Sequence, residues 1–230
     1  MPVLTKTIVE IEAEIDRYRQ NFGAVEHTGT ALRGFIGESL SLFAERAMCW
    51  YADRATYTTT SGEWDLDSVD FTVGASTFKA VRIRDIRTAT GLLVKIDEAE
   101  GVRRYQLPRE VQDGGQAYWM QTTDRAIELV PGPTVSTTYE CALWHYPTVV
   151  TSASNDATSV VFPHDAFQGF ILFTTARLML TTSGADAAKK QAEYEQRAEL
   201  AIASLKGKYA RHPEWLGYVG EPGVVSLGWK

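Results

Sequence analysis

The side chains able to do acid–base, nucleophilic or metal chemistry are few in this sequence, and they are scattered. Neither the four histidines nor the two cysteines have H-x-x-x-H or C-x-x-C spacing, which would bring zinc ligands together. No G-x-S-x-G nucleophile motif, P-loop or G-x-G-x-x-G motif is present. We therefore predict that the protein is not an enzyme and has no catalytic residue, metal or cofactor. The histidines are His27, His145, His164 and His212.

Short groups of carboxylates are the second chemical signal. Asp65 and Asp67 form one group, and a second lies within residues 97–100. Paired carboxylates can bind a cation, or act as the acid and nucleophile of a glycosidase. Acidic side chains of solvated turns have the same spacing, and we favour that interpretation. A hydrolase that uses Asp65, Asp67 or His145 is kept as an alternative.

The charge balance argues against a protein whose main task is to grip nucleic acid. Lysine and arginine number 23 against 29 acidic residues, which leaves a formal net charge of −6. Arg82, Arg84 and Arg87 make a local basic edge on one predicted strand. We interpret that edge as a solvated strand face.

The cysteines and the N-terminus indicate the compartment. Cys49 and Cys141 are far apart in sequence, which favours two packed thiols in a reducing environment. Residues 1–20 have no continuous apolar run and no cleavage site of the signal-peptide type. No stretch approaches the roughly 20 apolar residues that span a bilayer. We expect a soluble protein, made in a cytoplasm, with no membrane partner.

A predicted helical hairpin, residues 165–209, organises the rest of the chain. Residues 165–180 are apolar on nearly every face, which predicts a helix covered on all sides. Residues 185–209 predict a charged helix with a thin apolar stripe at Tyr194, Ala198, Ile202 and Leu205. Its charged side chains form i,i+4 pairs, which favours a surface facing solvent or another subunit. The predicted subunit-interface residues are Lys189, Lys190, Glu193 and Arg197.

Two further helices are predicted near the N-terminus. Residues 5–20 place isoleucines at steps of three and four, and a second helix runs from residues 28–30 to about residue 53. Gly34 and Gly37 lie inside the second helix, where each costs about 1 kcal/mol relative to alanine. Close approach of another backbone is one reason for such glycines.

From residue 56 the pattern changes to short strands. Residues 78–86 and 91–96 read as strands, and residues 135–146 form the longest candidate. About seven short strands with frequent turn signals are typical of an antiparallel sandwich or small barrel. We therefore predict an α+β fold in which residues 1–55 and 162–209 form a helical bundle. Residues 56–161 form an inserted β-rich, sandwich- or barrel-like domain.

The last segment, residues 210–230, differs from both parts. It combines glycine and proline, which oppose a helix, with more apolar side chains than a solvated tail carries. We interpret it as an extended arm that docks on a partner. The residues predicted to bind that partner are Trp215, Leu216, Tyr218, Val219, Val224, Val225, Leu227 and Trp229.

The running order of these segments resembles the head-to-tail adaptor (connector) proteins of tailed bacteriophages, particularly those of podovirus-type tails. The strand stretch FKAVRIRDI…GLLVKID is followed by YQLPREV, GGQAYWM and RAIELVPGPTVSTTYECALWHYPTVV. The hairpin then begins at FPHDAFQGFILFTTARLML. The most telling piece is residues 126–147, and the resemblance covers most of residues 5–209.

This resemblance implies a structural virion protein at the head–tail junction. It implies a homo-oligomeric ring of twelve copies between the portal protein and the tail nozzle, or tail tubular protein. Double-stranded DNA would pass through the ring without sequence-specific binding, and the C-terminal arm would reach the portal. The acidic balance suits such a conduit, because a basic wall would grip each phosphate.

A different class of protein is kept as the alternative. The strand-rich middle and the tryptophans near the C-terminus also suit a β-rich carbohydrate-binding or adhesion module. Loss of glycan binding on Trp215→Ala or Trp229→Ala would distinguish that module from a connector.

Overall fold

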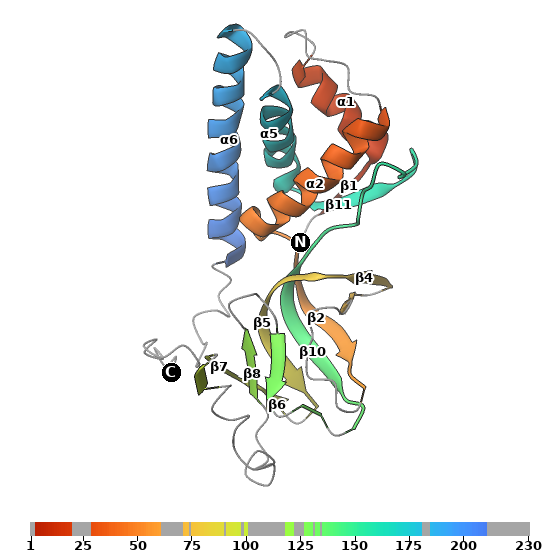
Figure 1. Cartoon of the computed structure of the whole chain (residues 1–230), viewed down its shortest axis with the longest axis vertical. Helices are drawn as coiled ribbons and strands as arrows, with labels where there is room; N and C mark the ends of the chain where they lie inside the picture. Colours follow the sequence, from red (N-terminus) through yellow and green to blue (C-terminus); the bar gives the residue numbers. More distant parts are fainter. Residues whose placement is uncertain are drawn as a thin grey trace. The chain divides into compact units, whose positions relative to one another are not determined.

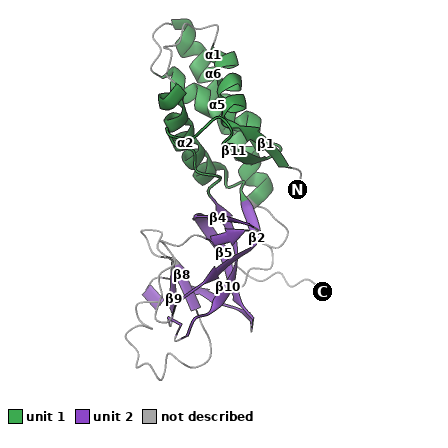
Figure 2. Cartoon of the chain, turned by 90° about the vertical axis from the view of Figure 1, so that its right-hand side faces the viewer, with its two compact units in different colours: residues 1–50, 146–211 green, residues 51–145, 212–230 purple. Residues whose placement is uncertain are grey.

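The computed structural model describes residues 3–19, 29–60, 71–73, 75–89, 91–97, 99–100, 118–121, 127–130, 132–133, 135–180 and 185–210. Its fold is mixed α/β, with four helices and several mostly antiparallel sheets among these residues. Contacts divide them into two compact units (Figure 2). The first takes residues from 1–50 and 146–211, and the second takes residues from 51–145.

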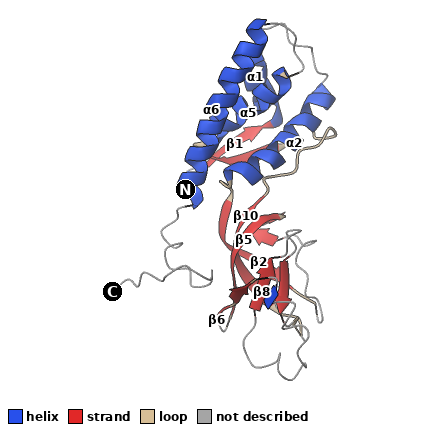
Figure 3. Ribbon diagram, turned by 60° about the vertical axis from the view of Figure 1, so that its left-hand side comes forward, coloured by secondary structure: helices blue, strands red, loops and turns tan. Residues whose placement is uncertain are grey.

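The first unit contains all four helices, drawn in blue in Figure 3. They are α1 (Ile8–Arg19), α2 (Gly29–Ala47), α5 (Ala166–Met179) and α6 (Ala185–Ala210). Helix α5 lies between α6 on one side and α1 and α2 on the other (Figure 1), and it contacts all three. The predicted central helix is therefore present and holds the middle of this unit.

The burial of α5 follows from its composition. Phe170, Ile171 and Leu172 are almost completely buried, and even the Thr174 and Thr175 side chains are inaccessible. Phe43 of α2 packs edge-on against Phe170, with ring centroids 5.7 Å apart. A helix apolar on every face is stable only when neighbours cover it on every side.

Helix α6 buries the stripe that its sequence predicts. Tyr194, Ala198, Ile202 and Leu205 are all at most 7% exposed, whereas the opposite face is charged and open. A Cβ atom added to Gly169 of α5 would lie 2.9 Å from the Cβ of Ala201. Glycine at position 169 therefore allows α5 and α6 to approach closely.

The N-terminal segment differs from its prediction. Residues 5–7 were expected to be helical, but Val3–Thr7 is strand β1, which pairs antiparallel with β11 (Ser159–Pro163). Helix α1 starts only at Ile8, where a capping box forms. The Thr7 backbone N–H donates to Glu10 at 2.8 Å, and the Glu10 N–H donates to the Thr7 hydroxyl at 3.3 Å. This reciprocal pair stops the helix from extending toward the N-terminus.

Helix α2 is shorter than predicted. It ends at Ala47 instead of near residue 53, and Met48 has a φ of 47°. A residue in the left-handed region turns the chain out of a helix. The Trp50 indole then donates to the Val161 carbonyl at 2.7 Å, and strand β2 (Tyr51–Thr58) begins at the next residue.

The second unit is built on an antiparallel sheet of order β4-β3-β2-β10-β5-β6. Strand β10 (Thr138–His145) lies between β2 and β5 (Ala80–Thr88). The other strands are β3 (Phe71–Val73), β4 (Ser76–Phe78) and β6 (Gly91–Leu92). The predicted strand 78–86 is thus divided at Lys79, between β4 and β5.

A separate sheet of three strands has order β7-β8-β9. Its strands are β7 (Val94–Ile96), β8 (Tyr118–Gln121) and β9 (Ile127–Val130), and β7 pairs with β8 in parallel. The predicted strand 91–96 therefore supplies two different sheets. The chain crosses between them at Leu93, whose N–H donates to the Ile86 carbonyl at 2.9 Å.

Strand β10 does not follow the strict alternation that its sequence predicts. The four residues Cys141 to Trp144 are all buried. The pairing of β10 with both neighbours shifts register within this stretch. A β-bulge re-aims successive side chains, so both faces of the strand can be covered. Cys141 and Leu143 join Ile83, Ile86 and Trp119 in the core of this unit.

Candidate functional site

The residues predicted to bind a partner fall in two places. All eight arm residues, from Trp215 to Trp229, lie outside the described residues, and their role stays a prediction. The predicted subunit-interface residues lie on the open face of α6. Lys190 contacts Glu193 at 2.7 Å, and Arg197 contacts Glu193 at 3.7 Å. These contacts form a charged surface on α6, and Lys189 beside them is also exposed.

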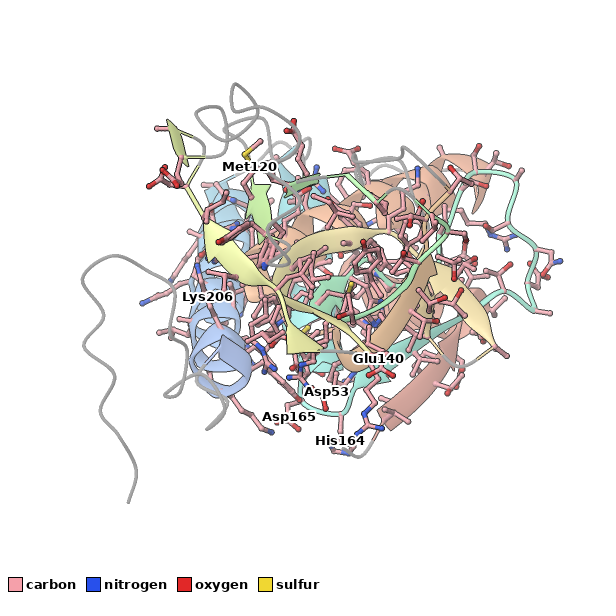
Figure 4. The ribbon with its side chains drawn as sticks, turned by 90° about the horizontal axis from the view of Figure 1, so that it is seen from below. Asp53, Met120, Glu140, His164, Asp165 and Lys206 are labelled. Carbon is pink, nitrogen blue, oxygen red and sulfur yellow. The ribbon has the colours of Figure 1, made fainter. Side chains whose placement is uncertain are left out.

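The scattered chemical side chains have structural contacts. His145 stacks on Phe78 with centroids 4.4 Å apart. His164 is exposed and lies 3.7 Å from Asp165 at the start of α5 (Figure 4). Asp97 accepts a hydrogen bond from the Glu100 N–H at 2.7 Å, as turn acids do. His27, His212, Asp65 and Asp67 lie outside the described residues. Among those described, no three potential metal ligands cluster.

Asp165 joins the two ends of the helical hairpin. Lys208, near the end of α6, donates a hydrogen bond to its carboxylate. This bond holds the pKa of Asp165 below its ordinary value. The contact is solvated, so it orients the two helices more than it stabilises them.

A buried ion network in the second unit corrects one prediction. Arg84 was expected on a solvated strand face, but its side chain is only 7% exposed and lies 2.7 Å from Asp85. Asp85 also contacts Arg87 at 3.2 Å, and Asp53 of β2 lies 3.8 Å from Arg84. The guanidinium of Arg84 also lies 5.5 Å from the Tyr51 ring centroid. Arg84, Asp85 and Arg87 all belong to β5, whereas Asp53 belongs to β2, on the far side of β10 in the sheet.

The two cysteines are free and buried, as the sequence predicts. Burial raises the pKa of both the Cys49 and the Cys141 thiol to about 12. A thiol with so high a pKa is not a thiolate at neutral pH and is a poor nucleophile. Both therefore act as core side chains.

Among the described residues, a groove with a volume of about 270 Å³ lies between α2, α5 and α6. We call it the α2–α5–α6 groove. The sequence did not reveal it, because its lining comes from three separate helices. Its lining residues are Leu42, Arg46, Phe173, Ala176, Arg177, Leu180, Gln191, Glu195, Ala198 and Glu199.

Two arginines flank the aromatic ring of Phe173 in this groove. Arg46 and Arg177 lie 5.6 Å and 5.7 Å from its centroid. Each is already paired, Arg46 with Glu199 at 2.7 Å and Arg177 with Glu38 at 2.8 Å. The groove is therefore an apolar surface with compensated charge at its edges, which suits a neutral protein partner better than a charged ligand.

None of the helices among the described residues combines the length and apolar character needed to cross a membrane. This finding comes from the helices themselves, since α5 is apolar but short and α6 is long but charged.

Comparison with protein families gives a match over nearly the whole chain. Residues 6–219 match the model of the family described as SU10 adaptor protein. A comparison with curated proteins finds no match. The family match agrees with the phage adaptor that the order of segments predicts, and it covers both compact units. The chain therefore belongs to the SU10 adaptor protein family.

Proposed function

We propose that this protein is a head-to-tail adaptor of a tailed bacteriophage, with a structural and not an enzymatic role. The observation that carries the proposal is the family match over residues 6–219. In this proposal, copies of the chain form a ring of twelve at the head–tail junction, between the portal protein and the tail nozzle. A podovirus-type tail belongs to the proposal as well.

The proposal gives each part of the chain a task. The helical unit, residues 1–50 and 146–211, packs in the ring, and residues 51–145 form the inserted β-rich domain, so both boundaries lie earlier in the chain than the sequence predicted. Residues 210–230 are the arm that binds the portal. Helix α6 ends at Ala210, so the arm starts where this helix stops. A helix firmly packed on α5 supplies a stable mount for a segment that binds elsewhere.

The apolar arm also supports a binding role on physical grounds. Eight large apolar side chains between residues 215 and 229 are costly to leave in water, at about 25 cal/mol per Å² of apolar surface. A partner that covers them supplies the driving force for attachment. An extended segment of this kind binds by adding a strand or by filling pockets with alternate side chains.

The test is deletion of residues 211–230, followed by binding to the purified portal ring. We expect the truncated chain to keep the circular dichroism and cooperative unfolding of the full chain, and to lose attachment to the portal by electron microscopy. The full-length Trp215→Ala and Trp229→Ala variants should weaken attachment without changing the fold. A truncated chain that still decorates the portal would contradict the role of the arm. A full chain that stays monomeric beside the portal would contradict the adaptor itself.

A further inference from the structure

The loop between β10 and β11 belongs to the helical unit, and contacts with α2 hold it in place. Arg33 of α2 donates to the Ser154 carbonyl at 2.8 Å and also contacts Asp156. Glu12 of α1 accepts from the same guanidinium at 2.9 Å, which fixes its direction. The loop is thus joined to two helices by one arginine.

Backbone packing reinforces this attachment. A Cβ atom added to Gly37 would lie 1.9 Å from the Val150 carbonyl oxygen, so the loop backbone rests directly on α2. Within the loop, the Thr151 N–H donates to the Ser154 hydroxyl at 2.9 Å. Val150 is buried by this contact, whereas Val149 beside it is 76% exposed. Val149 is therefore a solvent-exposed apolar side chain on a loop that is anchored to α2.

The α2–α5–α6 groove opens on the other side of the same helix. At about 100° per residue, Gly37 under the loop and Arg46 in the groove lie about 180° apart around α2. Figure 1 shows the same arrangement within the first unit, with α6 at the left edge and the segment leading into β11 at the right edge. Leu180, which lines the groove, is 70% exposed. An apolar projection and an apolar recess therefore face in opposite directions.

We propose that the loop around Val149 of one copy docks in the α2–α5–α6 groove of the next copy, as a head-to-tail contact. This inference rests on the proposed ring. A heterologous contact between two different surfaces is the kind that closes into a ring. The charges agree with this occupant: Arg46, Arg177, Glu195 and Glu199 balance within the groove, and residues 147–155 of the loop carry no charge.

The test is crosslinking in the full chain assembled on the portal ring. Cysteine is placed at position 149 and at position 180, where both native side chains are exposed, and a short bismaleimide is added. The native cysteines do not interfere, because both are buried and protonated. We expect the double variant to give a ladder of covalent multimers. A mixture of the Val149→Cys and Leu180→Cys single variants should give covalent dimers only, because each copy then offers one reactive side of the contact.

The matched control replaces the groove position. Leu200 is 65% exposed on α6 but does not line the groove. The double variant Val149→Cys/Leu200→Cys should therefore give no ladder of covalent multimers. Val149→Asp should also reduce the number of copies on each portal ring at least several-fold. Val135→Asp, at a valine 65% exposed in the second unit, should leave that number unchanged.

The outcomes separate this inference from the proposed function. A ladder from positions 149 and 180 alone supports the contact. Two results would overturn the contact and leave the adaptor role standing. One is full rings on the portal with no crosslink between positions 149 and 180. The other is a Val149→Asp variant that binds each portal ring in as many copies as the unchanged chain. Absence of any ring on the portal overturns both.

Discussion

At the scale of single residues, the second unit contains a buried ion pair, Arg84–Asp85. The two side chains are 7% and 6% exposed, and they meet at 2.7 Å through two nitrogens of the guanidinium. Removing one partner of a buried ion pair leaves the other charge buried without compensation, which destabilises the folded state. Replacing both partners by apolar side chains avoids that cost.

We expect Asp85→Ala to lower the free energy of unfolding by about 3–5 kcal/mol, because it leaves the Arg84 charge buried without its nearest carboxylate. The double variant Arg84→Met/Asp85→Leu should lose much less. Urea unfolding monitored by tryptophan fluorescence measures both. Arg87→Ala is the control, because the Arg87 side chain is 43% exposed and Asp85 keeps its closer contact with Arg84. A double variant as unstable as Asp85→Ala would show that the pair itself stabilises the sheet.

At the scale of elements, α2 does more than cover α5. One of its faces carries the loop between β10 and β11 through Arg33 and Gly37, and another lines the α2–α5–α6 groove. Its two internal glycines have different reasons to be there. Gly37 lies against the backbone at Val150, as the sequence suggested for such glycines, whereas a Cβ added at Gly34 would lie 3.7 Å from the Ser152 Cβ.

These two glycines allow a matched prediction. Gly37→Ala places a Cβ 1.9 Å from the Val150 oxygen, so the loop must move, and we expect a loss of about 1–3 kcal/mol from the overpacked contact. Gly34→Ala meets only an ordinary contact and should gain up to about 1 kcal/mol from helix propensity. Thermal unfolding of the two variants beside the unchanged chain measures the difference. Equal stability of the two variants would contradict the close approach at Gly37.

At the scale of the whole molecule, each of the two units has its own hydrophobic core, and one family model matches both. The helical unit has its core around α5, and the β-rich unit has its core around β10, β5 and Trp119. The family match spans both units. The net charge of −6 belongs to this scale as well.

We expect the protein to bind duplex DNA no more tightly than a Kd of about 10⁻⁴ M at physiological salt, because an acidic protein releases few counterions from DNA. Fluorescence anisotropy with two labelled duplexes of unrelated sequence measures this affinity. Both duplexes should behave alike, since the proposed DNA conduit would read no bases. Tight or sequence-dependent binding would contradict a passive channel wall.

The sequence by itself determined the helical hairpin and its surroundings. The all-round apolar character of residues 165–180 and the stripe through Tyr194 and Ile202 are local patterns, and local patterns specify helices. The buried free thiols of Cys49 and Cys141 and the resemblance to phage adaptors could also be predicted. The predicted arm and the α6 interface remain predictions, because the first lies outside the described residues and the second needs a partner.

Only the tertiary structure decided the features that depend on segments far apart in the chain. Residues 5–7 pair with Ser159–Pro163 as a strand, and no window of neighbouring residues contains that partner. The burial of Arg84 depends on register shifts between β5 and β10, which alternation within one strand cannot show. The α2–α5–α6 groove arises in the same way, because its lining residues come from three helices that meet only once the core around Phe43 and Phe170 has formed. Long-range packing, and not local propensity, places these side chains together.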